Sequence, residues 1–384
     1  MKNVLPKISC ASAVLASAAM ATAPVFAEGV TYTPIAGTNT TFTKTISMRE
    51  TANVPNVTFH YAVAAGAAQP ASNGKLAVFA GNDADKTNGK LPTIADITFT
   101  ASDAKETDKL SAKHTGTIDF SGVQYKEPGV YRYVITESGT CQGLSTEEDQ
   151  TKAVDVYVID NNGILEVAGY VMHNDEGAAA EQLSETKRLD DKDLDFLHTL
   201  TTSDVVLSKT VTGNQGSHDE YFKFTVKITG ADPNTKFSVD LANADATTKT
   251  NGINLEAHTN PDVIVAGADG SVTQDFWLQH NQSIKIEGLA ANTGYNVVED
   301  NGSYKTTTAV TGDTTNVATN DIATGNGATV TDAEVKADTT VAYTNNKQGA
   351  IPTGLFMSVG GAAVVTLLGG AGIATMVMRK KEEE

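Results

Sequence analysis

Cysteine is nearly absent from this sequence, which has only Cys10 and Cys141 in 384 residues. Many exported proteins use internal disulfides as covalent reinforcement, and a chain with one cysteine in its body cannot form one. Cys141 lies in the segment GTCQG, residues 139–143, which offers no neighbouring base and no helix start that would lower the pKa of its thiol. We interpret Cys141 as an incidental loop cysteine, so any covalent reinforcement must come from a different chemistry.

Aromatic and basic residues are also scarce. Aromatic side chains make up 6% of the chain, and 28 lysines and arginines stand against 46 aspartates and glutamates, for a formal net charge of −18. Nucleic acids and anionic lipid surfaces are poor partners for such an acidic protein. The seven histidines show no zinc-ligand spacing, and neither a phosphate-binding loop nor a catalytic triad is recognisable. The sequence therefore predicts no cofactor, no metal site and no enzyme that turns over.

The body of the chain favours β-structure. Glycine is frequent, with 33 residues, and short runs of alternating apolar and polar residues are separated by Asn, Asp and Gly turns. One strand-like run gives way to another near residues 201–204. We predict an all-β protein with two tandem β-sandwich domains, residues 28–203 and 204–349. The clearest strand-like runs are residues 131–137, 154–159, 194–200, 205–211, 222–228, 283–286 and 295–299.

The N-terminus has the features of an export signal. Lys2 and Lys7 precede an apolar stretch of small residues, and VFA at 25–27 places small residues at the −3 and −1 positions of a cleavage site. We expect residues 1–27 to form a signal peptide that is cleaved between Ala27 and Glu28. Cleavage there would also remove Cys10.

The C-terminus carries an apolar segment with a short motif before it. Residues 355–378 are uncharged and long enough for a transmembrane helix, and the charged tail 379–384 begins with cations that would stay in the cytoplasm. The sequence IPTG at 351–354 precedes this segment directly and resembles the cell-wall sorting signal of Gram-positive surface proteins. In that family a sortase attacks the carbonyl between Thr and Gly, here Thr353 and Gly354. An ordinary membrane anchor is the alternative interpretation.

Alternation within the strands places charged residues on apolar faces. Alternate residues of a strand lie on the same face, so Lys44 shares a face with Phe42 and Ile46. In the same way, Lys209 shares a face with Leu207 and Val211. The same test places Glu137, Glu299 and Asn345 beside apolar neighbours. A buried charge without a partner is costly, so we expect these groups to meet inside the protein. A lysine that reaches the sheet rim and pairs there is the alternative.

Several motifs make a family resemblance specific. They are KEPGVYRYVITE at 126–137, the two strands that begin with an inward lysine, SIKIEGL at 283–289 before GYNVVED at 294–300, and YTN at 343–345 ahead of the sorting signal. Over residues 40–354 the chain resembles the two-domain backbone pilins of Gram-positive streptococci. The resemblance implies two immunoglobulin-like domains, each closed by a Lys–Asn isopeptide bond with the help of a buried glutamate.

For the second domain the resemblance implies that Lys209 is the nucleophile, Asn345 the electrophile and Glu299 the proton shuttle. The residue types suit this chemistry, because burial favours a neutral amine and a protonated acid. The amine can attack the carboxamide carbon while the glutamate polarises the carboxamide oxygen and relays protons to the leaving ammonia. Fixed proximity assists, since well-oriented groups reach effective molarities of about 10⁵ M or more. Such a reaction occurs once per molecule.

The first domain departs from the family pattern. Lys44 and Glu137 match, but His198 occupies the position where the family has asparagine. Imidazole has no acyl carbon for a lysine to attack. Either Lys44 and Glu137 remain a buried ion pair with His198, or Asp195 replaces the asparagine. Because alternation places Asp195 on the face opposite His198, we predict no isopeptide bond in this domain.

Polymerisation by a sortase also requires a lysine that accepts the Thr353 acyl group of the next subunit. In the resembling pilins this lysine lies just before the last strand of the first domain. A strict alignment places Asp191 at the position of the family's linking lysine. Lys192, one residue away, is therefore the candidate, and Lys187 is the reserve. The alternative is that this charged run is only a solvated surface segment.

The implied protein is a cell-surface pilus subunit attached to peptidoglycan. Its implied partners are a pilin-type sortase, a housekeeping sortase, other copies of the chain and accessory pilins. The rival hypothesis is a monomeric wall-anchored adhesin with the same domains.

Overall fold

The computed structural model describes residues 34–35, 37–72, 74–145, 150–174, 176–182, 195–241, 258–320 and 328–349. Several predicted features lie outside these residues: the signal peptide with its cleavage site, the motif at 351–354, the apolar segment with its charged tail, and the candidate linking lysines Lys187 and Lys192. In the part of the chain that is described, no helix is long and apolar enough to cross a membrane.

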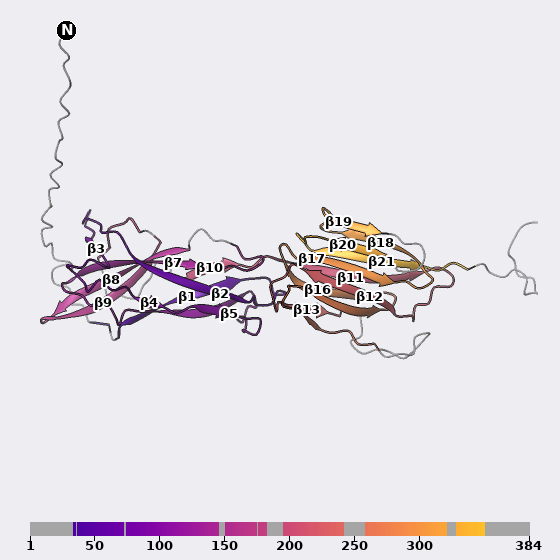
Figure 1. The fold of residues 1–384 in the computed structure, drawn as a ribbon, viewed down its shortest axis with the longest axis horizontal. Helices are drawn as coiled ribbons and strands as arrows, with labels where there is room; N and C mark the ends of the chain where they lie inside the picture. Colours follow the sequence, from indigo (N-terminus) through magenta and orange to yellow (C-terminus); the bar gives the residue numbers. More distant parts are fainter. Residues whose placement is uncertain are drawn as a thin grey trace, which may run out of the picture.

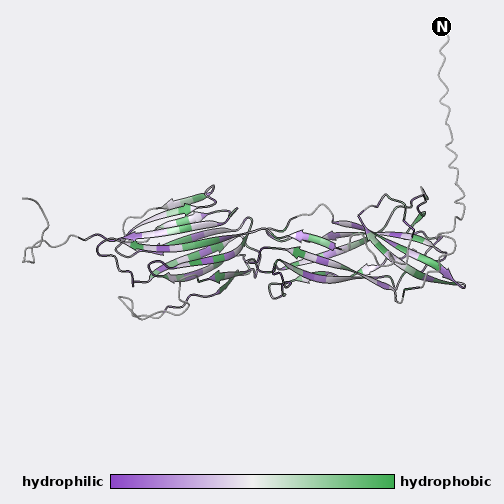
Figure 2. Ribbon diagram, turned by 180° about the vertical axis from the view of Figure 1, so that it is seen from behind, coloured by the Kyte–Doolittle hydropathy of each residue, from purple (hydrophilic) through white to green (hydrophobic). Residues whose placement is uncertain are grey.

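The described residues form strands joined by turns and loops, as the sequence predicts. Apolar and polar residues alternate along many of these strands (Figure 2). In the N-terminal half the strands are β1 (Asn39–Ser47), β2 (Val57–Ala65), β3 (Val78–Ala80), β4 (Thr93–Ile94), β5 (Ile97–Phe99), β6 (Ser111–Asp119), β7 (Gly129–Ser138), β8 (Thr151–Asn161), β9 (Ile164–His173) and β10 (Asp195–Thr199). In the C-terminal half they are β11 (Thr202–Thr212), β12 (Phe222–Thr229), β13 (Lys236–Asp240), β14 (Val263–Val265), β15 (Val272–Leu278), β16 (Ser283–Ala290), β17 (Gly294–Asp300), β18 (Lys305–Thr311), β19 (Val317–Asn320), β20 (Thr329–Asp332) and β21 (Thr339–Asn346).

Strands β1 to β10 form the first domain, a sandwich of two sheets. One sheet has the strand order β10-β1-β6-β4, and the other has the order β5-β2-β7-β8-β9 with β3 beside β7. Strand β1 lies between a parallel partner, β10, and an antiparallel partner, β6. The inner faces bury one apolar core, which includes Phe42, Phe59, Tyr131 and Val156. The first and last strands of the domain are therefore neighbours that run in the same direction.

The first domain also has a small outer layer, which the alternating pattern did not indicate. Leu76 and Ala180 pair through their backbones and pack with Val130 and Tyr157 over the outer face of β7 and β8. This layer buries Arg132 completely, although alternation places Arg132 on the face opposite the main core. The sheet thus carries a second, smaller core on its outer side.

The guanidinium of Arg132 is fully supplied with hydrogen-bond acceptors. It donates two bonds to the carboxylate of Asp155, at 2.6 and 2.7 Å, and two more to the carbonyl oxygens of Glu176 and Ala178, both at 2.7 Å. His173 lies 3.2 Å from the same carboxylate. A buried ion pair persists when such additional bonds satisfy its remaining polar groups.

Strands β11 to β21 form the second domain, again with two sheets. The sheet orders are β14-β13-β16-β11-β21-β18 and β15-β12-β17-β20-β19. Strand β11 repeats the arrangement of β1, since it pairs in parallel with the last strand, β21, and in antiparallel with β16. One difference concerns the last strand: β18 covers the outer edge of β21, whereas β10 is the edge of its sheet.

The two domains lie end to end, and the described chain enters at one end of the long axis and leaves at the other (Figure 1). Only Leu200 and Thr201 connect β10 to β11, and their backbone N–H groups bond to the carbonyl oxygens of Ser47 and Gly143. The connection is therefore short and bonded to the first domain.

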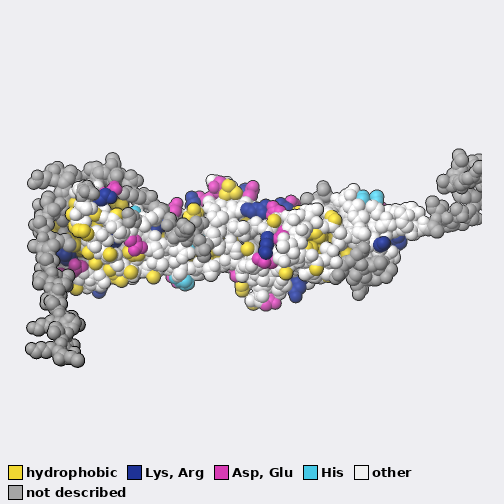
Figure 3. All heavy atoms as spheres, turned by 90° about the horizontal axis from the view of Figure 1, so that it is seen from above, with side chains coloured by type: hydrophobic (Ala, Val, Ile, Leu, Met, Phe, Trp, Pro, Cys, Tyr) yellow, Lys and Arg dark blue, Asp and Glu magenta, His cyan; other side chains and the backbone are white. Residues whose placement is uncertain are grey.

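Charged side chains of both signs gather near the middle of the face in Figure 3, where the domains meet.

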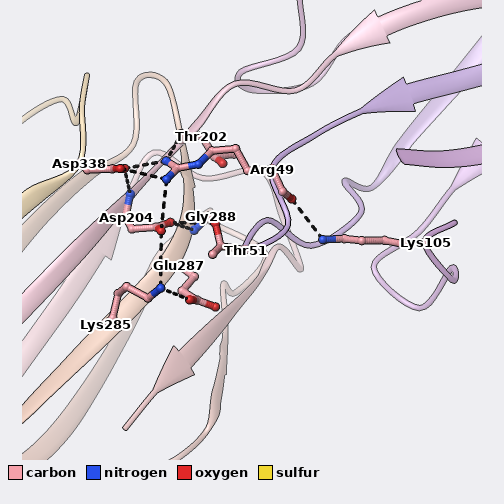
Figure 4. A network of polar contacts seen from close by, with 9 residues as sticks. All are labelled: Arg49, Thr51, Lys105, Thr202, Asp204, Lys285, Glu287, Gly288 and Asp338. Carbon is pink, nitrogen blue, oxygen red and sulfur yellow. Dashed lines mark hydrogen bonds and ion pairs between the residues drawn. The ribbon is translucent and has the colours of Figure 1, made fainter. Parts of the chain in front are cut away.

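Arg49 of the first domain reaches across this junction (Figure 4). It donates two bonds to the carboxylate of Asp338, at 2.6 and 2.9 Å, and one to the carbonyl oxygen of Thr202, at 3.0 Å. The same Asp338 accepts a bond from the backbone N–H of Asp204 at 2.9 Å. Because the side chain of Arg49 is 41% exposed and that of Asp338 is 58% exposed, the pair orients the domains more than it stabilises them.

The Arg132 cluster predicts a large stability loss confined to the first domain. Replacing Arg132→Ala leaves Asp155 buried without its guanidinium partner, and such a loss typically costs about 3–5 kcal/mol. Urea unfolding followed by far-UV circular dichroism should show the first-domain transition at lower urea. The fluorescence of Trp277, the single tryptophan and part of β15, should keep its own transition.

A matched control removes a lysine from an exposed ion pair. Lys223 pairs with Asp275 at 2.8 Å, with side chains 38% and 43% exposed, so Lys223→Ala should cost about 1 kcal/mol or less. Equal effects of the two substitutions would contradict the structural role assigned to Arg132.

Candidate functional site

Three polar side chains meet inside the second domain. Lys209 projects from β11, Asn345 from the neighbouring strand β21, and Glu299 from β17 in the facing sheet. In the parallel register of β11 and β21, Asn345 pairs with Val211, two residues beyond the lysine. At most 1% of each of the three residues is exposed. The period of two thus brings groups from both sheets into the apolar core.

The lysine and the asparagine both donate to one carboxylate oxygen. Lys209 Nζ lies 2.5 Å from Glu299 Oε1, and Asn345 Nδ2 lies 2.9 Å from the same atom. A nucleophilic amine and a carboxamide are therefore held together by one group that can carry a proton between their nitrogens. The reaction expected from the family resemblance also has Glu299 polarise the carboxamide oxygen. In the structure a different side chain, Thr306, donates to that oxygen, Asn345 Oδ1, at 2.5 Å.

The surroundings shift both titratable groups of this site toward neutrality. The rings of Phe222 and Phe224 lie 4.2 and 5.9 Å from Lys209 Nζ. Burial lowers the pKa of Lys209 to about 8, although Glu299 acts in the opposite direction. Burial also raises the pKa of Glu299, because the hydrogen bonds that it accepts offset the desolvation only in part. Both shifts make the neutral amine and the protonated carboxyl more accessible than they are in water.

The first domain contains a cluster at the corresponding place. Lys44 Nζ donates to Glu137 Oε1 at 2.6 Å, and His198 Nε2 lies 2.7 Å from the same oxygen. In the parallel register of β1 and β10, His198 pairs with Ile46, two residues beyond the lysine. His198 therefore occupies the position that Asn345 has in the second domain. Asp195 pairs with Thr43 and is exposed, on the other face of β10.

The electrostatics of the first cluster differ from those of the second. The carboxylate of Glu137 accepts a further bond from the hydroxyl of Tyr61 at 2.8 Å. Desolvation opposes ionisation of Glu137, but the hydrogen bonds from His198, Lys44 and Tyr61 outweigh it and lower the pKa of this carboxyl. The ring of His198 stacks on Phe59 at 5.3 Å and points its Nδ1 to the carbonyl oxygen of Ser145 at 2.6 Å. Among the described residues, the lysine and the histidine of this cluster both contact the carboxylate of Glu137, and the equivalent of Asn345 is an imidazole.

Two residues of the second site were not found from the sequence. Thr306 lies on β18 directly opposite Asn345, and Asn301 lies in the turn between β17 and β18. Both are fully buried. A threonine in the run KTTTAVT at 305–311 carries no signal of its own in a threonine-rich chain. Only the pairing of β18 with β21 brings its hydroxyl to the carboxamide.

Cys141 lies beside the domain junction and is half-buried. Burial and the nearby Asp232 raise the pKa of its thiol to about 12. A thiol with so high a pKa is protonated at neutral pH and is a poor nucleophile. The environment agrees with the interpretation of Cys141 as an unreactive loop residue.

Comparisons with known proteins agree with this arrangement. The family model of a domain of unknown function, DUF7601, matches residues 203–347. A pilin of Streptococcus pyogenes serotype M1 is 26% identical over 287 residues, which cover 74% of this chain and 76% of that pilin.

Solved structures extend the likeness to the fold. A crystal structure of the major pilin from Streptococcus pyogenes superposes with a TM-score of 0.52 at 23% identity, over 82% of this chain and all of that one. The major pilin T3.2 of the same species gives a TM-score of 0.50 at 21% identity, over 81% of this chain and 98% of that pilin. In sequence and in fold, the chain is therefore similar to the pilins of Gram-positive bacteria.

Proposed function

We propose that the chain is the structural subunit of a surface pilus. A sortase joins the Thr353 acyl group of one subunit to a lysine of the next, and the finished shaft is attached to peptidoglycan. An isopeptide bond between Lys209 and Asn345 reinforces each subunit. The observation that carries the proposal is the meeting of the buried amine and the carboxamide at one oxygen of Glu299.

The reaction of the second domain proceeds without any cofactor. Neutral Lys209 Nζ attacks Cγ of Asn345, and a new C–N bond forms. Glu299 Oε1 takes a proton from the attacking nitrogen and delivers one to Asn345 Nδ2, whose bond to Cγ breaks as ammonia leaves. Both nitrogens already lie within hydrogen-bond distance of this oxygen. The amine and the carboxamide become one secondary amide plus one ammonia.

The position of the bond suits a protein that carries tension. It would link the first strand of the domain to the last, so that force entering at the C-terminal end would pass directly into β11. It would also close a loop of more than 100 residues, and in the chain-entropy model a cross-link of that span stabilises by about 4–5 kcal/mol. A shaft made of such subunits gains resistance without any disulfide.

The proposed bond predicts a mass change. The intact wild-type chain should be lighter by one ammonia than its sequence mass after signal cleavage, because only the second domain reacts. Lys209→Arg and Glu299→Ala should each have the full mass. The matched control, Glu137→Ala in the first-domain cluster, should keep the deficit, and a wild-type chain of full mass would refute the bond.

The equivalence of His198 and Asn345 predicts that a bond can be installed in the first domain. His198→Asn places a carboxamide two residues beyond Lys44 in the register of β1 and β10, beside Glu137. After prolonged incubation, which allows for a slow reaction without a described counterpart of Thr306, mass spectrometry should show a loss of two ammonia molecules, and a tryptic digest should contain a branched peptide joining residues 44 and 198. His198→Gln, whose carboxamide is one methylene farther out, serves as the control. A mass deficit that stays at one ammonia would contradict the equivalence.

The polymer itself can be tested on cell-wall extracts boiled in detergent. A regular ladder of high-mass bands, detected with an antibody against this chain, is expected because covalent linkages survive boiling. Lys192→Ala should collapse the ladder to the monomer, whereas Lys187→Ala should leave it intact. A single monomer band in the wild type would instead support the wall-anchored adhesin.

A further inference from the structure

A hydroxyl group lies at the carboxamide oxygen of the second site. Thr306 Oγ1 is 2.5 Å from Asn345 Oδ1 and 3.2 Å from Glu299 Oε2. Thr306 is fully buried and lies directly opposite Asn345 in the antiparallel register of β18 and β21. The backbone pairing of β18 with β21 therefore fixes this contact, so it does not depend on a loop.

The direction of the hydroxyl proton follows from a second buried residue. Asn301 Nδ2 donates to Thr306 Oγ1 at 3.0 Å, so the hydroxyl oxygen acts as an acceptor on that side. Its single proton has two acceptors within reach, Asn345 Oδ1 at 2.5 Å and Glu299 Oε2 at 3.2 Å, and the much shorter contact favours Asn345 Oδ1. Asn301 is fully buried, and its own Oδ1 has no partner among the described residues. A buried polar atom without a partner is costly, which calls for an explanation in terms of what Asn301 does for its neighbour.

We propose that Thr306 is a catalytic residue of amide formation and that Asn301 is its positioning residue. This inference rests on the proposed Lys209–Asn345 bond. As Lys209 Nζ bonds to Cγ, the electron pair of the C=O bond moves to Oδ1, and the Thr306 hydroxyl stabilises the oxyanion by donating its hydrogen bond. When the intermediate collapses, the C=O bond re-forms and ammonia leaves with the proton from Glu299. Thr306 itself is unchanged.

The geometry divides the work between two side chains. Glu299 Oε1 is occupied by the attacking and the leaving nitrogen, at 2.5 and 2.9 Å. Charge develops on the carboxamide oxygen during attack, and a fixed donor aimed at that oxygen in a buried core lowers the barrier strongly. The hydroxyl of Thr306 is such a donor, while the glutamate moves protons.

The first domain offers an internal comparison. Its last strand, β10, is the edge of its sheet, so among the described residues no strand stands where β18 stands beside β21. Next to His198 the chain instead presents the carbonyl oxygen of Ser145, which accepts a hydrogen bond and cannot stabilise an oxyanion. The donor hydroxyl is thus found in the domain that has the reactive asparagine.

The test measures the rate of bond formation in newly made protein. The full-length chain is synthesised by cell-free translation with detergent micelles, and timed samples are quenched in denaturant and digested with trypsin. Mass spectrometry then follows the branched peptide that joins Lys209 to Asn345. Thr306→Val, which has the same shape without the hydroxyl, should slow the reaction about 100-fold or more, as loss of one oxyanion donor does in enzymes. Thr306→Ser should keep the wild-type rate, and so should the matched control Thr308→Val on the same strand.

The role of Asn301 is tested by a double-mutant cycle. Asn301→Ala should slow the reaction, and combining it with Thr306→Val should add no further loss, because Asn301 acts only through the hydroxyl. Additive losses would assign Asn301 a separate structural role and overturn its positioning of Thr306. Trp277 fluorescence shows whether the Thr306→Val variant folds. If it does not fold, the reaction rates of Asn301→Ala and Thr306→Ser still test the proposed roles of Thr306 and Asn301. A normal rate for Asn301→Ala or a slow rate for Thr306→Ser then overturns the proposal.

The outcomes separate this inference from the proposed function. No branched peptide in the wild-type chain would refute the isopeptide bond itself. A bonded wild type together with a folded Thr306→Val variant that reacts at the same rate would refute only the role of Thr306.

Discussion

The burial of a lysine beside a glutamate between two β-sheets is the constraint on which the rest of this structure depends. An amine and a carboxyl that leave water together must either pair, become neutral or react. Both domains place the lysine on their first strand. The residue two positions after the lysine pairs with Asn345 in the second domain and with His198 in the first. The glutamate comes from the facing sheet in each case. The shared architecture thus presents the same chemical problem twice in one chain.

The two domains solve this problem in opposite ways. In the second domain, burial dominates: the pKa of Lys209 falls to about 8 and that of Glu299 rises, so both groups move toward neutrality. In the first domain, three hydrogen-bond donors outweigh the desolvation and lower the pKa of Glu137, which keeps the charges in place. A histidine in place of the asparagine at the equivalent register position accompanies this difference in electrostatics.

Much of this arrangement could be predicted from alternation, and the remainder depends on contacts that alternation cannot show. A period of two requires no knowledge of tertiary structure, and it correctly indicated the burial of Lys44, Lys209 and Glu299. The contact of Thr306 with Asn345 depends on which strand pairs with β21, and the burial of Arg132 depends on a layer of distant segments over its sheet. Neither leaves a local periodic signal, because both are set by long-range pairing.

The different chemistry of the two domains fits a single path of force through the proposed pilus. With Lys192 as the linking residue, tension would enter the subunit a few residues before β10 and pass along β10 and the two-residue connection into β11. The Lys209–Asn345 bond would then transfer it to β21, which leads to Thr353. The other strands of the first domain would lie beside this path. On this hypothesis the path crosses from one strand to another only between β11 and β21, which is where the proposed covalent bond lies, and the ion pair of Lys44 and Glu137 lies outside the path.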